Sequence, residues 1–93
     1  MSRITIMLGL EDNIEDCFAV SPGIKIRFRN TTDHTISLTT QSGFKQLVTV
    51  EILSGKRSKK FSLDTDRDTD ALYEWEVQGM GPQATRRGTI KVT

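Results

Sequence analysis

The sequence predicts an all-β fold, a Greek-key sandwich or barrel of about seven to eight strands, and three observations favour it. Short apolar–polar alternations recur along the 93 residues, at the spacing of about 8–12 residues that sandwiches use. Turn-forming Gly, Pro, Asn and Ser residues separate these alternations. No segment of helical length repeats its apolar residues with a helical period. An immunoglobulin-like sandwich is the alternative, and in either case residues 1–93 form a single domain.

The N-terminal part of the chain contains alternating segments that predict strands. Residues 3–8 (RITIML) form the first, and a short strand at residues 17–20 ends at the Ser-Pro-Gly turn of residues 21–23. Residues 23–38 (GIKIRFRNTTDHTISL) predict two strands joined by a polar turn at residues 30–33. The first of these two strands points its apolar side chains inward and carries a basic stripe on its outer face, made of Lys25, Arg27 and Arg29.

The C-terminal part predicts four more strands, at residues 47–53 (LVTVEIL), 57–63 (RSKKFSL), 72–78 (LYEWEVQ) and 88–93 (GTIKVT). Along residues 72–78, alternation places a large apolar set on one face, which we expect in the core: Tyr73, Trp75 and Val77. The connections between these strands are expected to be an acidic loop at residues 64–70 (DTDRDTD) and a flexible loop at residues 79–87.

The composition excludes several classes of protein. Thirteen basic and twelve acidic side chains give a net charge of +1, which disfavours general nucleic-acid binding. No apolar run reaches the length of about 18 residues that a membrane span needs. The single cysteine, Cys17, excludes a disulfide within the chain and favours a reducing compartment. We therefore expect a cytoplasmic protein, with a mature periplasmic or secreted form that has lost its leader as the alternative.

Three segments, taken in order, resemble the cupredoxin (blue copper) family. The first, AVSPGIKIRFRNTTDHTISL, carries a Pro-Gly turn that leads a strand into an Asn and, a few residues later, a His. The second, SGKRSKKFSL, is similar to the family's Gly turn and the alternating strand after it. The third, ALYEWEVQGMGPQATRRGTIKV, resembles the closing element, in which an aromatic alternation enters a ligand loop before a Gly-Thr-Ile-x-Val strand. The resemblance implies a Greek-key sandwich of the cupredoxin type.

The resemblance also implies where copper ligands would lie. In the family, mononuclear copper is bound by a His from the first loop and by a Cys, a His and often a Met from the last. His34 matches the first ligand, but Val77 stands where the Cys is expected and Met80 is the only donor in the last loop. A blue-copper site requires a thiolate and two imidazoles. The resemblance therefore implies a cupredoxin-like domain that lacks the electron-transfer centre.

The residues suggest two other metal sites, one for Cu(I) and one for calcium, and each has a structural alternative. His34 and Met80, and with them Met7, offer soft ligands that suit Cu(I). The alternative is that His34 is a turn residue whose ring hydrogen-bonds the neighbouring backbone. Four alternating aspartates look like the opening of a calcium loop: Asp64, Asp66, Asp68 and Asp70. Thr69 and Trp75 stand where the helix-loop-helix calcium motif requires Gly and Glu, which favours a solvated acidic loop.

Positive charge is concentrated on one predicted hairpin, where we expect the surface that binds a protein partner: Lys56, Arg57, Lys59 and Lys60. With the acidic residues at 11–16 and 64–70, it predicts a charge dipole that would steer association. The alternative is that exposed strands carry Lys and Arg to discourage edge-to-edge aggregation. No aromatic residues interleave with these charges to make a stacking platform, so a nucleic-acid partner is disfavoured.

These patterns together predict a non-enzymatic binding or structural module, without a cofactor, that presents loops to a protein partner or to further copies of itself. A weak copper-binding or copper-handling protein that uses His34 and Met80 is the alternative. An enzyme is disfavoured, because no Ser/His/Asp or Cys/His constellation appears at a plausible spacing. Cys17 is interpreted as a small buried hydrophobic residue.

Overall fold

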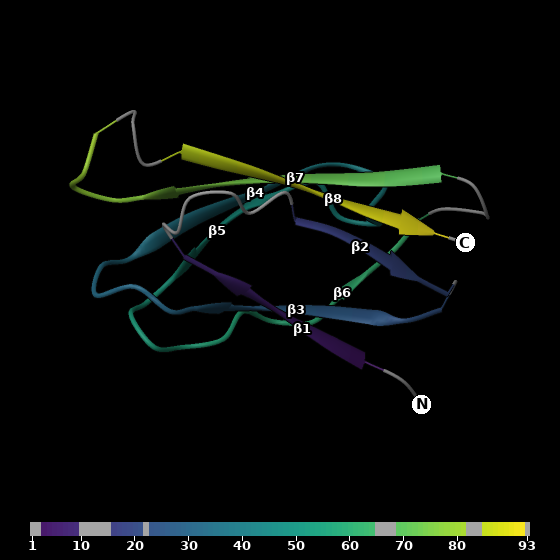
Figure 1. Cartoon of the computed structure of the whole chain (residues 1–93), viewed down its shortest axis with the longest axis horizontal. Helices are drawn as coiled ribbons and strands as arrows, with labels where there is room; N and C mark the ends of the chain where they lie inside the picture. The colour runs from purple at the N-terminus through teal and green to yellow at the C-terminus, as the bar shows by residue number, and fades with distance from the viewer. Residues whose placement is uncertain (1–2, 10–15, 22, 65–68, 82–84, 93) are drawn as a thin grey trace.

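The computed structural model describes residues 3–9, 16–21, 23–64, 69–81 and 85–92, and for residues 16–18 and 69 it describes the backbone alone. Within these ranges the chain forms eight β-strands and no helix. The strands make two sheets that face each other across a shared core (Figure 1). The predicted all-β fold is therefore confirmed, and its two-layer form is that of a β-sandwich.

The smaller sheet has three strands in the order β1-β3-β6, which are β1 (Arg3–Leu8), β3 (Lys25–Asn30) and β6 (Phe61–Ser62). β1 and β3 run parallel, whereas β3 and β6 run antiparallel. β3 is therefore the central strand of this sheet, and β1 and β6 are its edges.

The larger sheet has five strands in the order β2-β8-β7-β4-β5. Its strands are β2 (Asp16–Val20), β8 (Thr85–Val92), β7 (Thr69–Val77), β4 (Ile36–Ser42) and β5 (Thr49–Ile52). β2 lies parallel to β8, and the other neighbours are antiparallel. The core between the two sheets takes buried side chains from all eight strands, with the largest share from β7.

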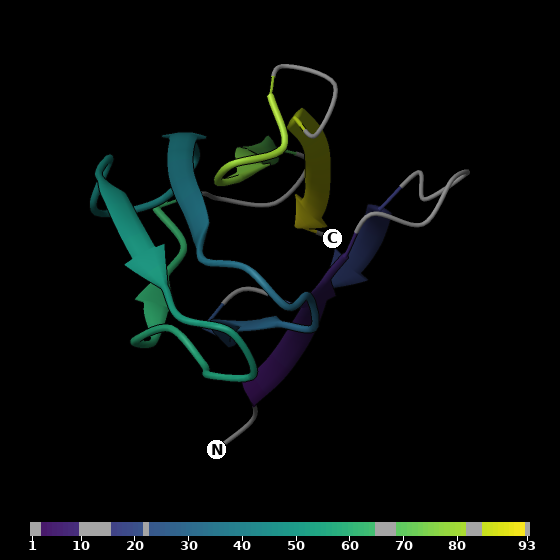
Figure 2. The same ribbon diagram turned by 90° about the vertical axis from the view of Figure 1, so that its left-hand side faces the viewer.

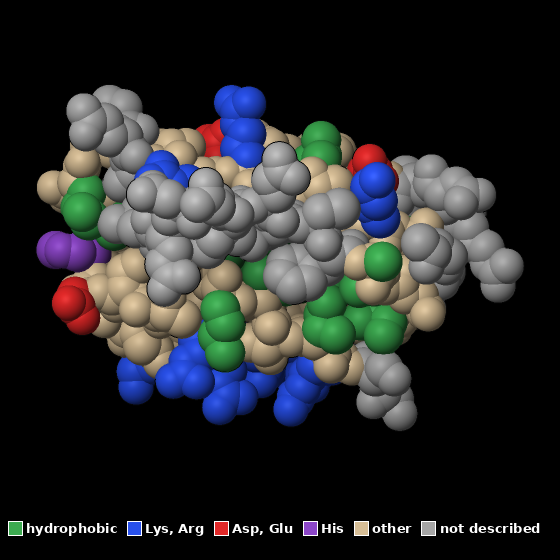
Figure 3. Space-filling model, viewed as in Figure 1, with side chains coloured by type: hydrophobic (Ala, Val, Ile, Leu, Met, Phe, Trp, Pro, Cys, Tyr) green, Lys and Arg blue, Asp and Glu red, His purple; other side chains and the backbone are tan. Residues whose placement is uncertain are grey.

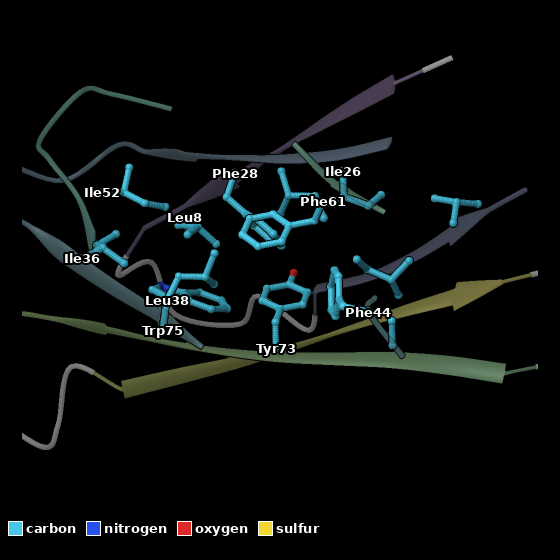
Figure 4. Packing of buried hydrophobic residues seen from close by; sticks show 14 of the residues in the cluster. Leu8, Ile26, Phe28, Ile36, Leu38, Phe44, Ile52, Phe61, Tyr73 and Trp75 are labelled. Atoms are coloured by element: carbon cyan, nitrogen blue, oxygen red, sulfur yellow. The ribbon is translucent and has the colours of Figure 1, made fainter. Parts of the chain in front are cut away.

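An aromatic cluster occupies the middle of the core (Figure 4). Phe28 of β3 lies across the sandwich from Tyr73 of β7, with their ring centroids 4.9 Å apart. Tyr73 stacks along its own strand on Trp75, and Phe61 meets Phe28 edge to face at 5.8 Å. The predicted inward face of β7 is confirmed, because Tyr73, Trp75 and Val77 are all buried.

Two strands are shorter than the alternation predicts. β5 lacks residues 47, 48 and 53 of the expected strand, and the Leu47 and Leu53 side chains are 60% and 61% exposed. β6 contains only two of residues 57–63. Ser58 explains that loss, because its hydroxyl accepts a hydrogen bond from the Phe28 amide (2.9 Å) and donates one to the Lys59 carbonyl (2.7 Å). A side chain thus takes a position in the ladder that backbone pairing would otherwise fill.

Two strands are longer than predicted, and each extends into an expected loop. β7 begins at Thr69 and β8 begins at Thr85, and the two pair as one hairpin from Thr69 opposite Val92 to Glu76 opposite Thr85. Gly88 lies opposite Tyr73 in this hairpin, and a Cβ atom there would come within 2.2 Å of the tyrosine ring. The glycine therefore makes room for the central aromatic ring, which explains why a strand interior tolerates it.

Candidate functional site

Three connections gather at one end of the sandwich, which we call the loop end: residues 31–35 after β3, 53–57 after β5 and 78–81 after β7 (Figure 1). They meet because Ile36 at the start of β4 pairs with both Ile52 and Val77, the last residues of β5 and β7. Figure 2 views the sandwich from this end. Residues far apart in the sequence are thereby brought together by sheet register.

Asn30 holds the loop end in place. It is the last residue of β3 and is 0% exposed. Its amide nitrogen donates to the carbonyls of Ile52 (2.8 Å) and His34 (2.6 Å), and its amide oxygen accepts from the backbone N–H (2.8 Å) and the hydroxyl (2.7 Å) of Thr32. All donors and lone pairs of this side chain therefore have partners. A buried, fully bonded amide of this kind fixes the conformation of the loop that carries His34.

His34 and Met80, the predicted copper ligands, both lie at the loop end and are exposed (Figure 3 shows the histidine). The Gln78 amide donates to the Thr35 carbonyl at 2.8 Å, which continues the β4–β7 ladder by one step and places the two loops side by side. Among the described residues, the hydrogen bonds of His34 involve its backbone and none involves its ring. The prediction that the ring bonds to the neighbouring backbone is therefore wrong. The backbone of His34 is bonded instead, which leaves the imidazole facing solvent.

Of the further donors, Met7 lines a hollow together with Thr31, Thr32 and Asp33, residues of the loop that carries His34. Met7 lies on the outer face of β1, in the other sheet. No group of three or more His, Cys, Asp or Glu side chains in the described part of the chain is placed to hold a metal ion. The predictions for the Cys17 side chain and for Asp66 and Asp68 lie outside the described residues.

The outer surface of the smaller sheet is basic. Along β3, Ile26, Phe28 and Asn30 are buried, so the residues between them face outward: Lys25, Arg27 and Arg29. Figure 3 shows Lys and Arg side chains gathered along the side of the molecule where Figure 1 places β1 and β3. The outward direction of the predicted basic stripe is therefore confirmed.

The 55–58 turn adds two more cations to this surface. Arg57 forms an antiparallel bridge with Arg29. The hydrogen bonds flanking this bridge run from the Asn30 amide to the Lys56 carbonyl (2.9 Å) and from the Ser58 amide to the Phe28 carbonyl (2.7 Å). Arg29 and Arg57 are therefore a non-hydrogen-bonded pair, the type in which opposite side chains come closest. Like charges in this position destabilise a sheet.

A hollow lies between β3 and this turn, and it is lined by Arg27, Arg29, Gly55, Lys56, Arg57 and Ser58. We call Lys25, Arg27, Arg29, Lys56 and Arg57 the basic face. No ion pair involves the basic face within the described residues, where the one salt bridge joins Arg87 to Glu74 (3.1 Å) on the larger sheet. The buried Nε atom of Arg27 has no hydrogen-bond partner there either. The hollow is thus a concentration of positive charge that the described chain does not neutralise.

Edge protection does not explain the basic stripe. β3 is the central strand of its sheet, so its outward residues cannot shield an edge, and that alternative is wrong for Arg27 and Arg29. It still applies to Lys59 and Lys60, which precede the edge strand β6. Lys59 also has local partners: its ammonium donates to the Gln46 side chain (2.7 Å) and lies 5.4 Å from the centre of the Phe61 ring.

The structure therefore divides the four predicted partner-binding residues into two pairs. It places Lys56 and Arg57 beside Arg29, whereas Lys59 and Lys60 lie outside the lining of the hollow. Sequence reasoning noticed both the stripe and the hairpin but did not join them, because the Arg29–Arg57 register is a long-range property. Asn30 was missed as an organising residue. An Asn at a strand end with Thr two residues later is a recognisable signal for such a turn.

Comparison with known proteins assigns no relative: no protein-family model matches the chain, and no curated protein matches it significantly. In the described part of the chain, no helix has the length and apolar character needed to cross a membrane.

Proposed function

We propose that this protein is a non-enzymatic binding module, a cupredoxin-like Greek-key sandwich without a blue-copper centre, that docks onto an acidic protein through its basic face. The observation that carries the proposal is the Arg29–Arg57 pair, two cations at directly opposite backbone positions with no acidic counterpart among the described residues. Such a pair costs folding free energy in the isolated protein. An acidic partner would convert that cost into a favourable interaction and would speed association by electrostatic steering.

A protein partner suits this face better than a nucleic acid does. Single-stranded nucleic acids bind where aromatic rings interleave with basic side chains. The aromatic side chains that the structure describes are all buried, and they are Phe28, Phe44, Phe61, Tyr73 and Trp75. A net charge of +1 also gives little of the general attraction that phosphate backbones require. A cytoplasmic location, favoured by the single cysteine, belongs to the same proposal.

The proposal is tested by binding of a short polyglutamate peptide, followed by fluorescence anisotropy at several salt concentrations. The variant Arg57→Glu should weaken binding by at least about tenfold, because it reverses a charge at the centre of the basic face. The control is Lys91→Glu, which makes the same charge change at an exposed position of β8 on the other sheet. Equal loss in both variants would show that net charge, not this face, drives binding, and would overturn the proposal.

The second candidate function is weak binding or handling of copper. It is favoured by one observation, the Gln78–Thr35 hydrogen bond that holds the loops of His34 and Met80 side by side. Imidazole and thioether are suitable ligands for Cu(I). Anaerobic titration against a competing Cu(I) chelator tests it, with His34→Ala, Met80→Ala and Met7→Ala as variants and Leu47→Ala, at an exposed apolar position, as the control. Affinity that is unchanged in His34→Ala would end this candidate.

A further inference from the structure

We propose that the hollow between β3 and the 55–58 turn binds the phosphate group of a phosphorylated side chain on the partner protein. This inference rests on the proposed function and makes it specific: the acidic partner would be recognised through phosphoserine or phosphothreonine.

Backbone hydrogen bonds fix the positions from which the cationic side chains extend around the hollow. Gly55 adopts a φ of +73° in a tight turn that the Lys56 amide closes on the Leu53 carbonyl (2.9 Å). The Gly55 amide also donates to the Asn30 carbonyl (3.0 Å), which ties the turn to the end of β3. Below the turn, the Ser58 hydroxyl is anchored to the Phe28 amide. Because hydrogen bonds hold the backbone on both sides, the ordering needed when an anion enters is that of the Arg and Lys side chains.

The charge of the hollow matches a phosphate better than a carboxylate. Four cationic side chains line it, Arg27, Arg29, Lys56 and Arg57. A carboxylate brings a single negative charge, whereas a phosphorylated side chain brings about −1.5 to −2 and three strong acceptor oxygens at neutral pH. Arginine presents a planar fork of N–H donors that fits such oxygens, and Arg clusters are a recurrent way to recognise phosphorylated motifs.

Two details of the hollow strengthen this match. Arg27 lines the hollow, and its buried Nε–H has no hydrogen-bond acceptor within the described residues, so this side chain would gain from an ionised acceptor. Arg29 and Arg57 repel each other across the bridge. A dianion bound between them would attract both, and these two attractions would outweigh the repulsion.

The first part of the test uses inorganic phosphate alone. Thermal unfolding is measured with phosphate and with chloride at equal ionic strength, and the arginine Nε–H signals are followed by NMR. Phosphate should raise the melting temperature and shift the Arg27 signal. In Arg57→Gln, the free protein should melt about 1–5 °C higher because one of two opposed charges is gone, while the effect of phosphate should disappear. The control Lys91→Gln should keep the phosphate effect.

The second part compares three peptides of one acidic sequence that differ at a single central position, which carries serine, glutamate or phosphoserine. We expect the phosphoserine peptide to bind at least about tenfold tighter than the other two, and we expect Arg57→Gln to remove that advantage. Equal binding of the three peptides would overturn this inference and leave the proposed function standing. No binding of any of them would overturn both. Tighter binding of anionic vesicles or of a single-stranded oligonucleotide would overturn the assignment to a phosphorylated protein.

Discussion

Replacement of Asn30 by alanine is the sharpest test of how the loop end is built. The substitution removes four hydrogen bonds at once, two donated to Ile52 and His34 and two accepted from Thr32. At about 1 kcal/mol net for each bond, the full loss would be about 4 kcal/mol. Water can replace part of this at Thr32 and His34, which reach the surface, so we expect a loss of about 2–4 kcal/mol. For a domain of this size, that is a large part of a total stability of about 5–14 kcal/mol.

Urea denaturation followed by tryptophan fluorescence measures this loss, since the one tryptophan, Trp75, lies in the core. The midpoint should fall while the slope stays constant, because the surface exposed on unfolding is unchanged. The matched control is Thr49→Ala, which removes an exposed hydroxyl pair with Thr39 and should change stability by less than about 0.5 kcal/mol. A loss below about 1 kcal/mol in Asn30→Ala would refute the argument that this side chain holds the loop end together.

Three further variants test the packing and the surface, each by the same denaturation assay. Gly88→Ala should cost about 1–3 kcal/mol or more, because the new methyl group would overlap the Tyr73 ring; a near-neutral result would mean that the hairpin shifts easily. Trp75→Ala should cost about 3–5 kcal/mol, as expected for a fully buried indole, and a loss below about 1 kcal/mol would contradict its core position. Because Trp75→Ala removes the one tryptophan, the unfolding of this variant is followed by circular dichroism. Lys59→Glu should change stability by less than about 1 kcal/mol, since the side chain is exposed and its contacts with Gln46 and Phe61 are at the surface. A severe loss of stability would show that this segment is not exposed to solvent.

The sequence predicted what local alternation controls. The faces of β3 and β7 follow from a two-residue period, and every buried aromatic on those strands lies where that period places it. The ends of strands were less predictable. β6 begins late because the Ser58 side chain takes over a ladder bond, and β8 begins early because β7 offers it a long partner. Such boundaries depend on which strands become neighbours, and propensity alone contains no information about that.

The same distinction between local alternation and long-range strand pairing applies to the candidate sites. The outward direction of Arg27 and Arg29 is a local property, and alternation predicted it. The hollow is not local, because it needs Arg57 to stand opposite Arg29, a register set by a bridge between segments that are far apart in the chain. Likewise, His34 and Met80 both lie at the loop end because β4 and β7 pair with Ile36 opposite Val77. Residue types could therefore be proposed from the sequence, but their groupings could not.

Asn30 connects the two candidate sites physically. Its side chain holds the loop that presents His34, while its backbone bonds to both Gly55 and Lys56 in the turn that borders the hollow. The loop end and the basic face are therefore supported by one buried residue at the end of β3. Alanine keeps these backbone bonds, but it loses the side-chain bond to the carbonyl of Ile52, the residue before the 53–57 connection. Asn30→Ala should therefore loosen that connection and weaken anion binding, although the substituted side chain lies outside the hollow. Arg57→Gln should instead weaken anion binding while stabilising the free protein, because it removes charge and leaves the scaffold intact. The opposite signs of the two stability changes separate a residue that positions the site from one that would touch its ligand.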